Sequence, residues 1–117
     1  MKIIKQLAVL SLVLPALAFA QANTPGVDQR QANQERRIEQ GVASGSLTQR
    51  EANRLERGQA RVDRMENRAK ADGVVTARER ARLNQAQNVQ SRHIYAEKHD
   101  RQHDYNHNGR VDRPRRR

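Results

Sequence analysis

Residues 43–59 read ASGSLTQREANRLERGQ, and the pattern returns 28 residues later as ADGVVTARERARLNQAQ over residues 71–87. Eight of the seventeen aligned positions are identical. Each copy holds a glycine, which favours the positive φ angle common where a helix ends. Each also holds Thr-x-x-Glu, a capping box whose side chains bond the first backbone N–H groups of a new helix. The predicted helix-capping residues are Thr48, Glu51, Thr76 and Glu79.

The repeat predicts an all-α fold, a small antiparallel helical hairpin or bundle, with helices over about residues 28–40, 49–71 and 77–103. The apolar stripe of the middle helix comprises Ala52, Leu55, Val62, Met65 and Ala69, and that of the third comprises Leu83, Ala86, Val89 or Gln90, and Ile94. The other faces are polar, as on solvated helices. We expect residues 28–103 to form the domain, between a flexible segment at 21–27 and a disordered tail at 104–117.

The first twenty residues are typical of a secretory signal peptide. Two lysines precede an apolar run, and Ala18-Phe19-Ala20 forms a small-x-small cleavage site. The run is too short to span a bilayer. We therefore expect residues 1–20 to be removed, no transmembrane segment to remain, and the mature chain to be periplasmic or secreted.

The composition of the mature chain limits the size of its core. It carries 21 basic and 13 acidic side chains, a net charge of +8, and no cysteine for a disulfide. Only thirteen of its 97 residues have larger aliphatic side chains. Burying one contributes about 1.5–3 kcal/mol, whereas ordering one residue costs about 1–2 kcal/mol of backbone entropy. These values predict one small unit that needs help from an ion or a partner, with a homodimer among the alternatives.

The back half of each copy resembles the calcium loop of the EF-hand family. That loop has twelve positions, with oxygen ligands at 1, 3, 5, 7, 9 and 12 and glycine at 6. With Gly45 at position 6, the closing glutamate is Glu51, and Gly73 and Glu79 match in the same way. The front halves differ: positions 1, 3 and 5 are Gln40, Val42 and Ser44 in one copy and Arg68, Lys70 and Asp72 in the other. Because Arg and Lys repel a cation, both copies are predicted to be structural.

Residues 104–112 read DYNHNGRVD. Unlike either repeat copy, this segment has side-chain oxygens at every ligand position in the front half of the calcium-loop pattern. Ligand positions 1, 3, 5 and 9 are filled by Asp104, Asn106, Asn108 and Asp112, around Gly109 at position 6. Position 12 is Arg115 instead of a bidentate glutamate. The resemblance therefore implies weak calcium binding, with a Kd of about 10⁻⁴–10⁻³ M or poorer. The alternative is a polar turn formed by Asn-Gly.

Two further polar groups lie near the end of the chain. The histidines His99, His103 and His107 are spaced by four. On a helix, two of these imidazoles share a face that can hold zinc, nickel or copper, and solvated polar residues are the alternative. The basic tail contains Arg110, Arg113, Arg115, Arg116 and Arg117. Such tails bind anions by charge, and the scarcity of aromatic residues argues against specific nucleic-acid binding.

These patterns leave three hypotheses for function. No cysteine nucleophile or phosphate-binding glycine loop is present, and we expect no enzyme activity. The leading hypothesis is a non-enzymatic, EF-hand-like protein that binds divalent cations weakly. LTQRE at 47–51 and VTARE at 75–79 are also similar to the repeats of periplasmic LTxxQ stress chaperones, which implies binding to unfolded proteins. The third hypothesis is a basic protein that binds anionic envelope polymers.

Overall fold

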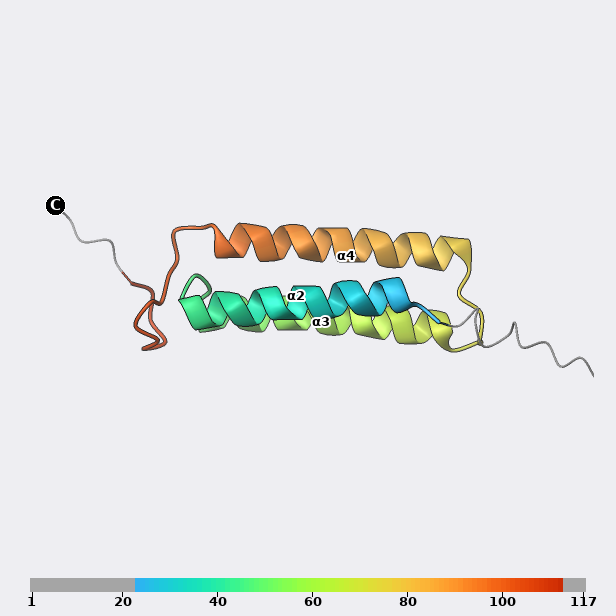
Figure 1. Ribbon diagram of the computed structural model, residues 1–117, viewed down its shortest axis with the longest axis horizontal. Helices are drawn as coiled ribbons and strands as arrows, with labels where there is room; N and C mark the ends of the chain where they lie inside the picture. The colour runs from blue at the N-terminus through green and yellow to red at the C-terminus, as the bar shows by residue number, and fades with distance from the viewer. Residues whose placement is uncertain (1–22, 113–117) are drawn as a thin grey trace, which may run out of the picture.

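Three long helices, α2 (Pro25–Ser44), α3 (Gln49–Lys70) and α4 (Ala77–Lys98), lie side by side in the computed structural model, which describes residues 23–112 (Figure 1). Successive helices run antiparallel, and each contacts the other two. Between residues 23 and 112 there is no strand. The predicted all-α antiparallel bundle is therefore confirmed.

Two of the sequence predictions concern residues at the ends of the chain. The signal peptide predicted for residues 1–20 lies outside the described residues, and so do residues 113–117. Within 23–112, none of the three helices combines the length and the apolar character required to cross a membrane.

Both predicted capping boxes are present at the starts of α3 and α4. Thr48 Oγ1 accepts from Glu51 N at 3.3 Å, while Glu51 Oε2 accepts from Thr48 N at 2.8 Å. The bonds at Thr76 and Glu79 are 3.1 and 2.7 Å. Each box satisfies two backbone donors that a helix start leaves without intrahelical partners. The repeat thus fixes where two of the three helices begin.

Removing the second cap should destabilise the bundle more than removing a neighbouring surface charge. Thr76→Ala loses the bond to Glu79 N and is expected to cost about 0.5–2 kcal/mol. Arg78→Ala, two residues on at an exposed position, should stay within about 0.5 kcal/mol. Urea unfolding of both variants measures the difference. Equal shifts in the unfolding free energy would refute the role of the cap.

The N-terminal helix begins earlier than predicted. Pro25 stands in its first turn, where the fixed φ of proline favours helix formation. Thr24 is buried, and its hydroxyl bonds the Glu66 carboxylate on α3, which also pairs with Lys70 at 2.6 Å. The flexible segment predicted for 21–27 is therefore wrong from Thr24 onward, because this contact anchors the chain.

The third helix ends at Lys98, five residues before the predicted end. His99 leaves the helical conformation with φ −113° and ψ 12°. The Asp100 carboxylate then accepts from Gln102 N at 2.7 Å. This local bond gives the backbone an alternative to helical hydrogen bonding, and it directs the chain away from the axis of α4.

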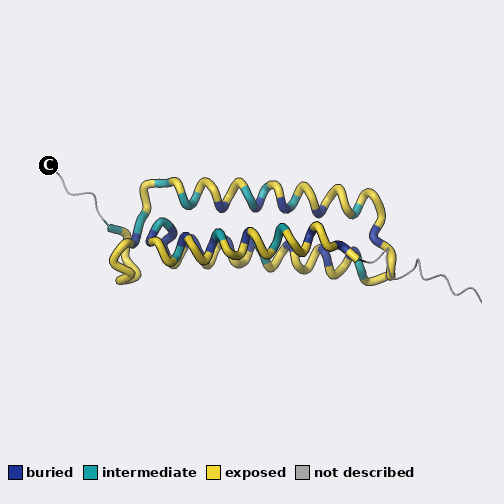
Figure 2. The backbone as a smooth tube through the Cα atoms, viewed as in Figure 1, coloured by how far each residue is buried: buried dark blue, intermediate teal, exposed yellow. Residues whose placement is uncertain are grey.

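The core consists of two apolar clusters, one toward each end of the bundle. Buried positions lie on the faces that the helices turn toward one another (Figure 2). One cluster comprises Ile38, Leu47, Ala52, Leu55 and Ile94, and the other comprises Val27, Ala69, Val75 and Leu83. Most of the predicted stripe is buried, but Met65 is 39% exposed, and Ala86 and Val89 are only half-buried.

Three glutamines lie buried between these clusters. Gln34 Nε2 donates to Gln87 O at 2.9 Å, and Gln87 Nε2 donates to Val27 O at 2.9 Å. Gln90 Nε2 donates to Leu55 O at 2.8 Å. Gly58 gives Gln90 its space, since a Cβ there would lie 2.2 Å from Gln90 Oε1. The bundle therefore joins its helices by amide hydrogen bonds where aliphatic residues are lacking.

Candidate cation loop and the end of the bundle

The segment after α4 forms a defined loop around the Asp104 carboxylate. Asp104 Oδ1 accepts from Asn108 N at 3.0 Å, and its Oδ2 accepts from Gly109 N at 2.9 Å. Asn106 Oδ1 also accepts from Asn108 N, at 3.1 Å, and Asn108 Oδ1 accepts from Arg110 N at 2.8 Å. Three side chains at alternate positions thus turn their oxygens toward the backbone of the same loop.

Asp112 closes this loop. Its Oδ2 accepts from Tyr105 N at 2.7 Å, and its Oδ1 accepts from Asn106 Nδ2 at 3.0 Å. Its own N–H donates to His103 O at 2.7 Å. The disordered tail predicted from residue 104 is therefore wrong for 104–112, because side-chain oxygens satisfy the backbone of a segment that has no helix or strand.

Two residues of the loop have positive φ angles: Gly109 with φ 77° and His107 with φ 54°. Asp104 N donates to Gly45 O at 2.8 Å, which attaches the loop to the turn between α2 and α3. A Cβ at Gly45 would lie 2.6 Å from Asp104 O and from Tyr105 Cα. The bundle thus supports one side of the loop, where no side chain could fit at Gly45.

The structure brings all four predicted calcium ligands of residues 104–112 into this one loop. Each carboxylate or amide oxygen has two lone pairs, so those bonded once to a backbone N–H can still accept a second partner. Asp104 is buried, whereas Asn106 and Asn108 are exposed and Asp112 is half-buried. The arrangement offers two carboxylates and two amide oxygens to a hard cation.

In both repeat copies, most residues aligned with the front half of a calcium loop are helical. Gln40, Val42 and Ser44 belong to α2, while Arg68 and Lys70 belong to α3. The connections between helices are only four and six residues, 45–48 and 71–76. Within the described chain, the likeness of these copies to a calcium loop is therefore confined to the glycine turn and the capped helix.

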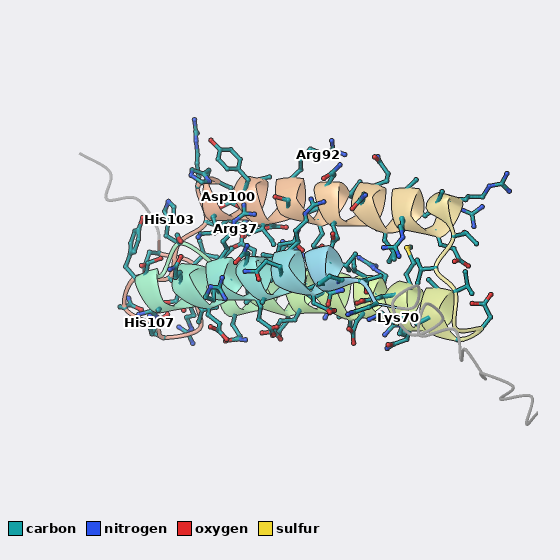
Figure 3. The ribbon with its side chains drawn as sticks, turned by 45° about the vertical axis from the view of Figure 1, so that its right-hand side comes forward. Arg37, Lys70, Arg92, Asp100, His103 and His107 are labelled. Carbon is teal, nitrogen blue, oxygen red and sulfur yellow. The ribbon has the colours of Figure 1, made fainter. Side chains whose placement is uncertain are left out.

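The three histidines do not form a common site. Because α4 ends at Lys98, His99 and His103 are not on one helical face. His99 stacks on Tyr95 and His103 stacks on Tyr105, with ring centroids 4.0 and 4.8 Å apart. Figure 3 shows His103 and His107 at the same end of the bundle. Among residues 23–112, three or more metal-ligating groups converge in one place only, and no histidine is among them.

That place is a group of carboxyl side chains which the sequence did not reveal. Glu51, Glu97 and Asp100 each offer one carboxylate oxygen, and these atoms lie within 4.8 Å of one another. Burial raises the pKa of Glu51 from 4.5 to about 7, and the adjacent Asp100 carboxyl contributes to the rise. Knowledge of the antiparallel topology would have suggested the group, since it places the start of α3 beside the end of α4.

Glu66, the other buried glutamate of α3, has different partners from those of Glu51. Burial alone would raise the pKa of Glu66, but hydrogen bonds from Lys70 and Thr24 outweigh it and hold that pKa below its usual value. Glu66 therefore has a cation and a hydroxyl as compensating partners. Glu51 has neither a lysine nor an arginine bonded to it within the described residues.

Arginines gather on the outer surface of the bundle. Of the predicted polyanion-binding arginines, Arg110 is exposed in the loop, and the other four lie outside the described residues. A hollow of about 570 Å³ between α3 and α4 is lined by Arg61, Arg64, Met65, Arg68, Ala69, Glu79 and Arg82. The sequence alone did not indicate this surface, because its arginines lie on two different helices.

The chain was compared with models of protein families, with curated proteins and with solved structures, and none of them matches it.

Proposed function

We propose that this chain is a small non-enzymatic protein that binds calcium weakly through residues 104–112. The observation that carries the proposal is the loop around Asp104, whose carboxylate accepts two backbone N–H groups at 3.0 and 2.9 Å. These bonds hold the carboxylate in position before any ion arrives, so less ordering entropy is lost on binding. The sequence match to positions 1, 3, 5, 6 and 9 of an EF-hand loop supports the same assignment.

The expected affinity is low because the loop has few charged ligands. Asp104 and Asp112 supply its only carboxylates, and Arg115 stands where an EF-hand loop has its bidentate glutamate. Asp112 is also engaged with Tyr105 N and Asn106 Nδ2 and must rearrange or share its lone pairs. We expect a Kd of about 10⁻⁴–10⁻³ M, in the range of extracellular calcium modules.

The bundle acts in this proposal as a platform for the loop. The bond from Asp104 N to Gly45 O ties the first ligand to the turn between α2 and α3. The predicted signal peptide supports a location in the periplasm or outside the cell, where millimolar calcium affinity is useful. The chaperone hypothesis lacks such support, because Leu55, Leu83 and Ile94, which would hold unfolded clients, are at most 3% exposed.

Calorimetric titration with Ca²⁺ tests the loop directly. Asp104→Ala removes the central carboxylate and is expected to abolish the millimolar binding assigned to the loop. Glu79→Ala changes the capping glutamate of α4 and should leave that binding intact. Equal affinity of the Asp104→Ala variant and the unchanged protein would exclude the loop as the calcium site.

Anion binding by the arginine-lined hollow is a second candidate function. Its four arginines, Arg61, Arg64, Arg68 and Arg82, have no ion pair within residues 23–112, and Met65 adds an exposed apolar surface. This combination suits an anionic polymer or headgroup. Affinity for such a polyanion should fall steeply with added salt because bound counterions are released. Binding that does not depend on salt would contradict this candidate.

A further inference from the structure

The carboxyl group cluster at the end of the bundle is separate from the proposed calcium loop. Glu51 lies in the first turn of α3, Glu97 in the last turn of α4, and Asp100 just beyond it. Their nearest oxygens lie within 4.8 Å of one another. Figure 3 shows Asp100 where α4 ends. Three ionised carboxylates at this separation repel one another, and a bound cation or a proton relieves that repulsion.

The Glu51 carboxyl is fully enclosed, and half of it has no hydrogen-bond partner. The side chain is 0% exposed. Its Oε2 accepts from Thr48 N, whereas Oε1 is buried and no residue of 23–112 donates a hydrogen bond to it. The Asp100 carboxyl lies beside it, with one oxygen of each within 4.8 Å of the other. An enclosed oxygen acceptor facing a second carboxylate is a position that a cation can fill.

One positive side chain, that of Arg54, pairs with this group, but it contacts only Glu97. Arg54 Nη2 contacts both oxygens of Glu97 at 3.1 Å. Asp100 has one oxygen bonded to Gln102 N, which carries no full charge. When all three carboxylates are ionised, Arg54 therefore offsets one charge, and no other ion pair with this group is found among residues 23–112.

We infer that Glu51, Glu97 and Asp100 form a second site, which binds one calcium ion. The donors are all carboxylate oxygens, which suit hard cations such as Ca²⁺ better than the softer transition metals. Oxygens bound to one Ca²⁺ at about 2.3–2.6 Å lie at most about 5.2 Å from one another. The three oxygens lie within 4.8 Å of one another, which is compatible with one Ca²⁺ between them. Mg²⁺ keeps several of its waters and is usually bound by only one or two carboxylates, so three protein carboxylates favour Ca²⁺.

This inference does not rest on the loop at 104–112, and the test keeps the two apart. The full chain carrying Asp104→Ala lacks the loop site, so any remaining calcium binding must arise elsewhere. In that background, Glu51→Gln removes the enclosed carboxylate. Glutamine also completes a capping box, so the start of α3 should persist. Glu79→Gln makes the same change in the matched capping box of α4 and serves as the control.

The measurement is Ca²⁺ titration at pH 8, together with broadening of backbone NMR signals by Mn²⁺ as a paramagnetic probe. We expect Asp104→Ala to retain a calcium site, and added Glu51→Gln to weaken it at least tenfold, since even partners outside the ligand shell contribute 10–100-fold. Added Glu79→Gln should have no effect. Mn²⁺ should broaden the amides of Glu51 and Asp100.

Two results would overturn the inference. One is the loss of all calcium binding in the Asp104→Ala protein, which would leave the loop as the cation site. The other is an unchanged affinity after Glu51→Gln with sharp amide signals at Glu51 and Asp100. If Glu51→Gln perturbs the circular dichroism spectrum, Asp100→Asn, which alters a residue outside the helices, replaces it in the same comparison.

Discussion

Glu51→Gln is expected to stabilise the bundle by about 3 kcal/mol at pH 8 when divalent cations are removed with a chelator. Burial raises the pKa of Glu51 to about 7, so at pH 8 the native state must hold an ionised carboxylate beside Asp100. Glutamine removes this charge and keeps an oxygen for the bond from Thr48 N. Its amide group can also donate to the Asp100 carboxylate.

The dependence on pH follows from the direction of this pKa shift. In the unfolded chain Glu51 titrates near 4.5, whereas in the native state it titrates near 7. Between these values the native state binds more protons than the unfolded state, so the stability contributed by Glu51 falls as pH rises. It is fully present below about pH 4.5 and is lost above about pH 7. Glu51→Gln should remove this slope.

Urea unfolding at pH 5 and pH 8 measures the effect as a difference between variants. Contributions from groups that both proteins share cancel in this difference. Glu79→Gln is the matched control, because it alters the other capping glutamate, which is not enclosed by carboxylates. If Glu51→Gln were only as stable as the unchanged protein at pH 8, the ionised Glu51 carboxylate would not destabilise the native state.

Gly45→Ala is expected to cost about 2–3 kcal/mol and to detach the loop from the bundle. Gly45 has φ 77°, a conformation that costs a residue with a Cβ about 1–2 kcal/mol. The new Cβ would also lie 2.6 Å from Asp104 O and Tyr105 Cα. Because these are backbone atoms, the loop must move, and the bond from Asp104 N to Gly45 O is lost.

Gly73→Ala is the control variant, because it introduces the same backbone strain without disturbing the contact between the turn and the loop. Gly73 has φ 81°, but a Cβ there meets nothing within 4 Å. It should therefore cost only the conformational term of about 1–2 kcal/mol. Hydrogen exchange should show faster exchange of the Asp104 and Asn108 amides in Gly45→Ala alone. Equal exchange in the two variants would mean that the loop does not depend on the turn at Gly45.

The sequence predicted the features that depend on local chemistry. Thr48 and Thr76 begin helices because a capping box needs only residues three apart. Periodicity placed Gln90 on the apolar stripe only as an alternative to Val89 and did not include Gln87, because an amide enters a core only when carbonyls of other helices accept its bonds. Arg115, the predicted defect of the loop, lies outside the described residues.

The features that the sequence did not predict involve contacts between residues far apart in the chain. Asp104 N bonds Gly45 O in the turn between α2 and α3, and Asp100 lies beside Glu51. The histidine site was predicted on a helix that would continue to His103. The helix instead ends at Lys98, and the Asp100 carboxylate accepts from Gln102 N beyond it. Such outcomes depend on tertiary structure and are not encoded in spacing alone.

An NMR titration of the unchanged protein tests most directly whether calcium binds at residues 104–112. Added Ca²⁺ should shift the amide signals of Asn108 and Gly109, whose N–H groups bond the Asp104 carboxylate. The shifts should saturate in the range of about 10⁻⁴–10⁻³ M, while the Gly73 amide stays in place. A shift at Gly73 with unmoved signals at Asn108 and Gly109 would contradict the assignment.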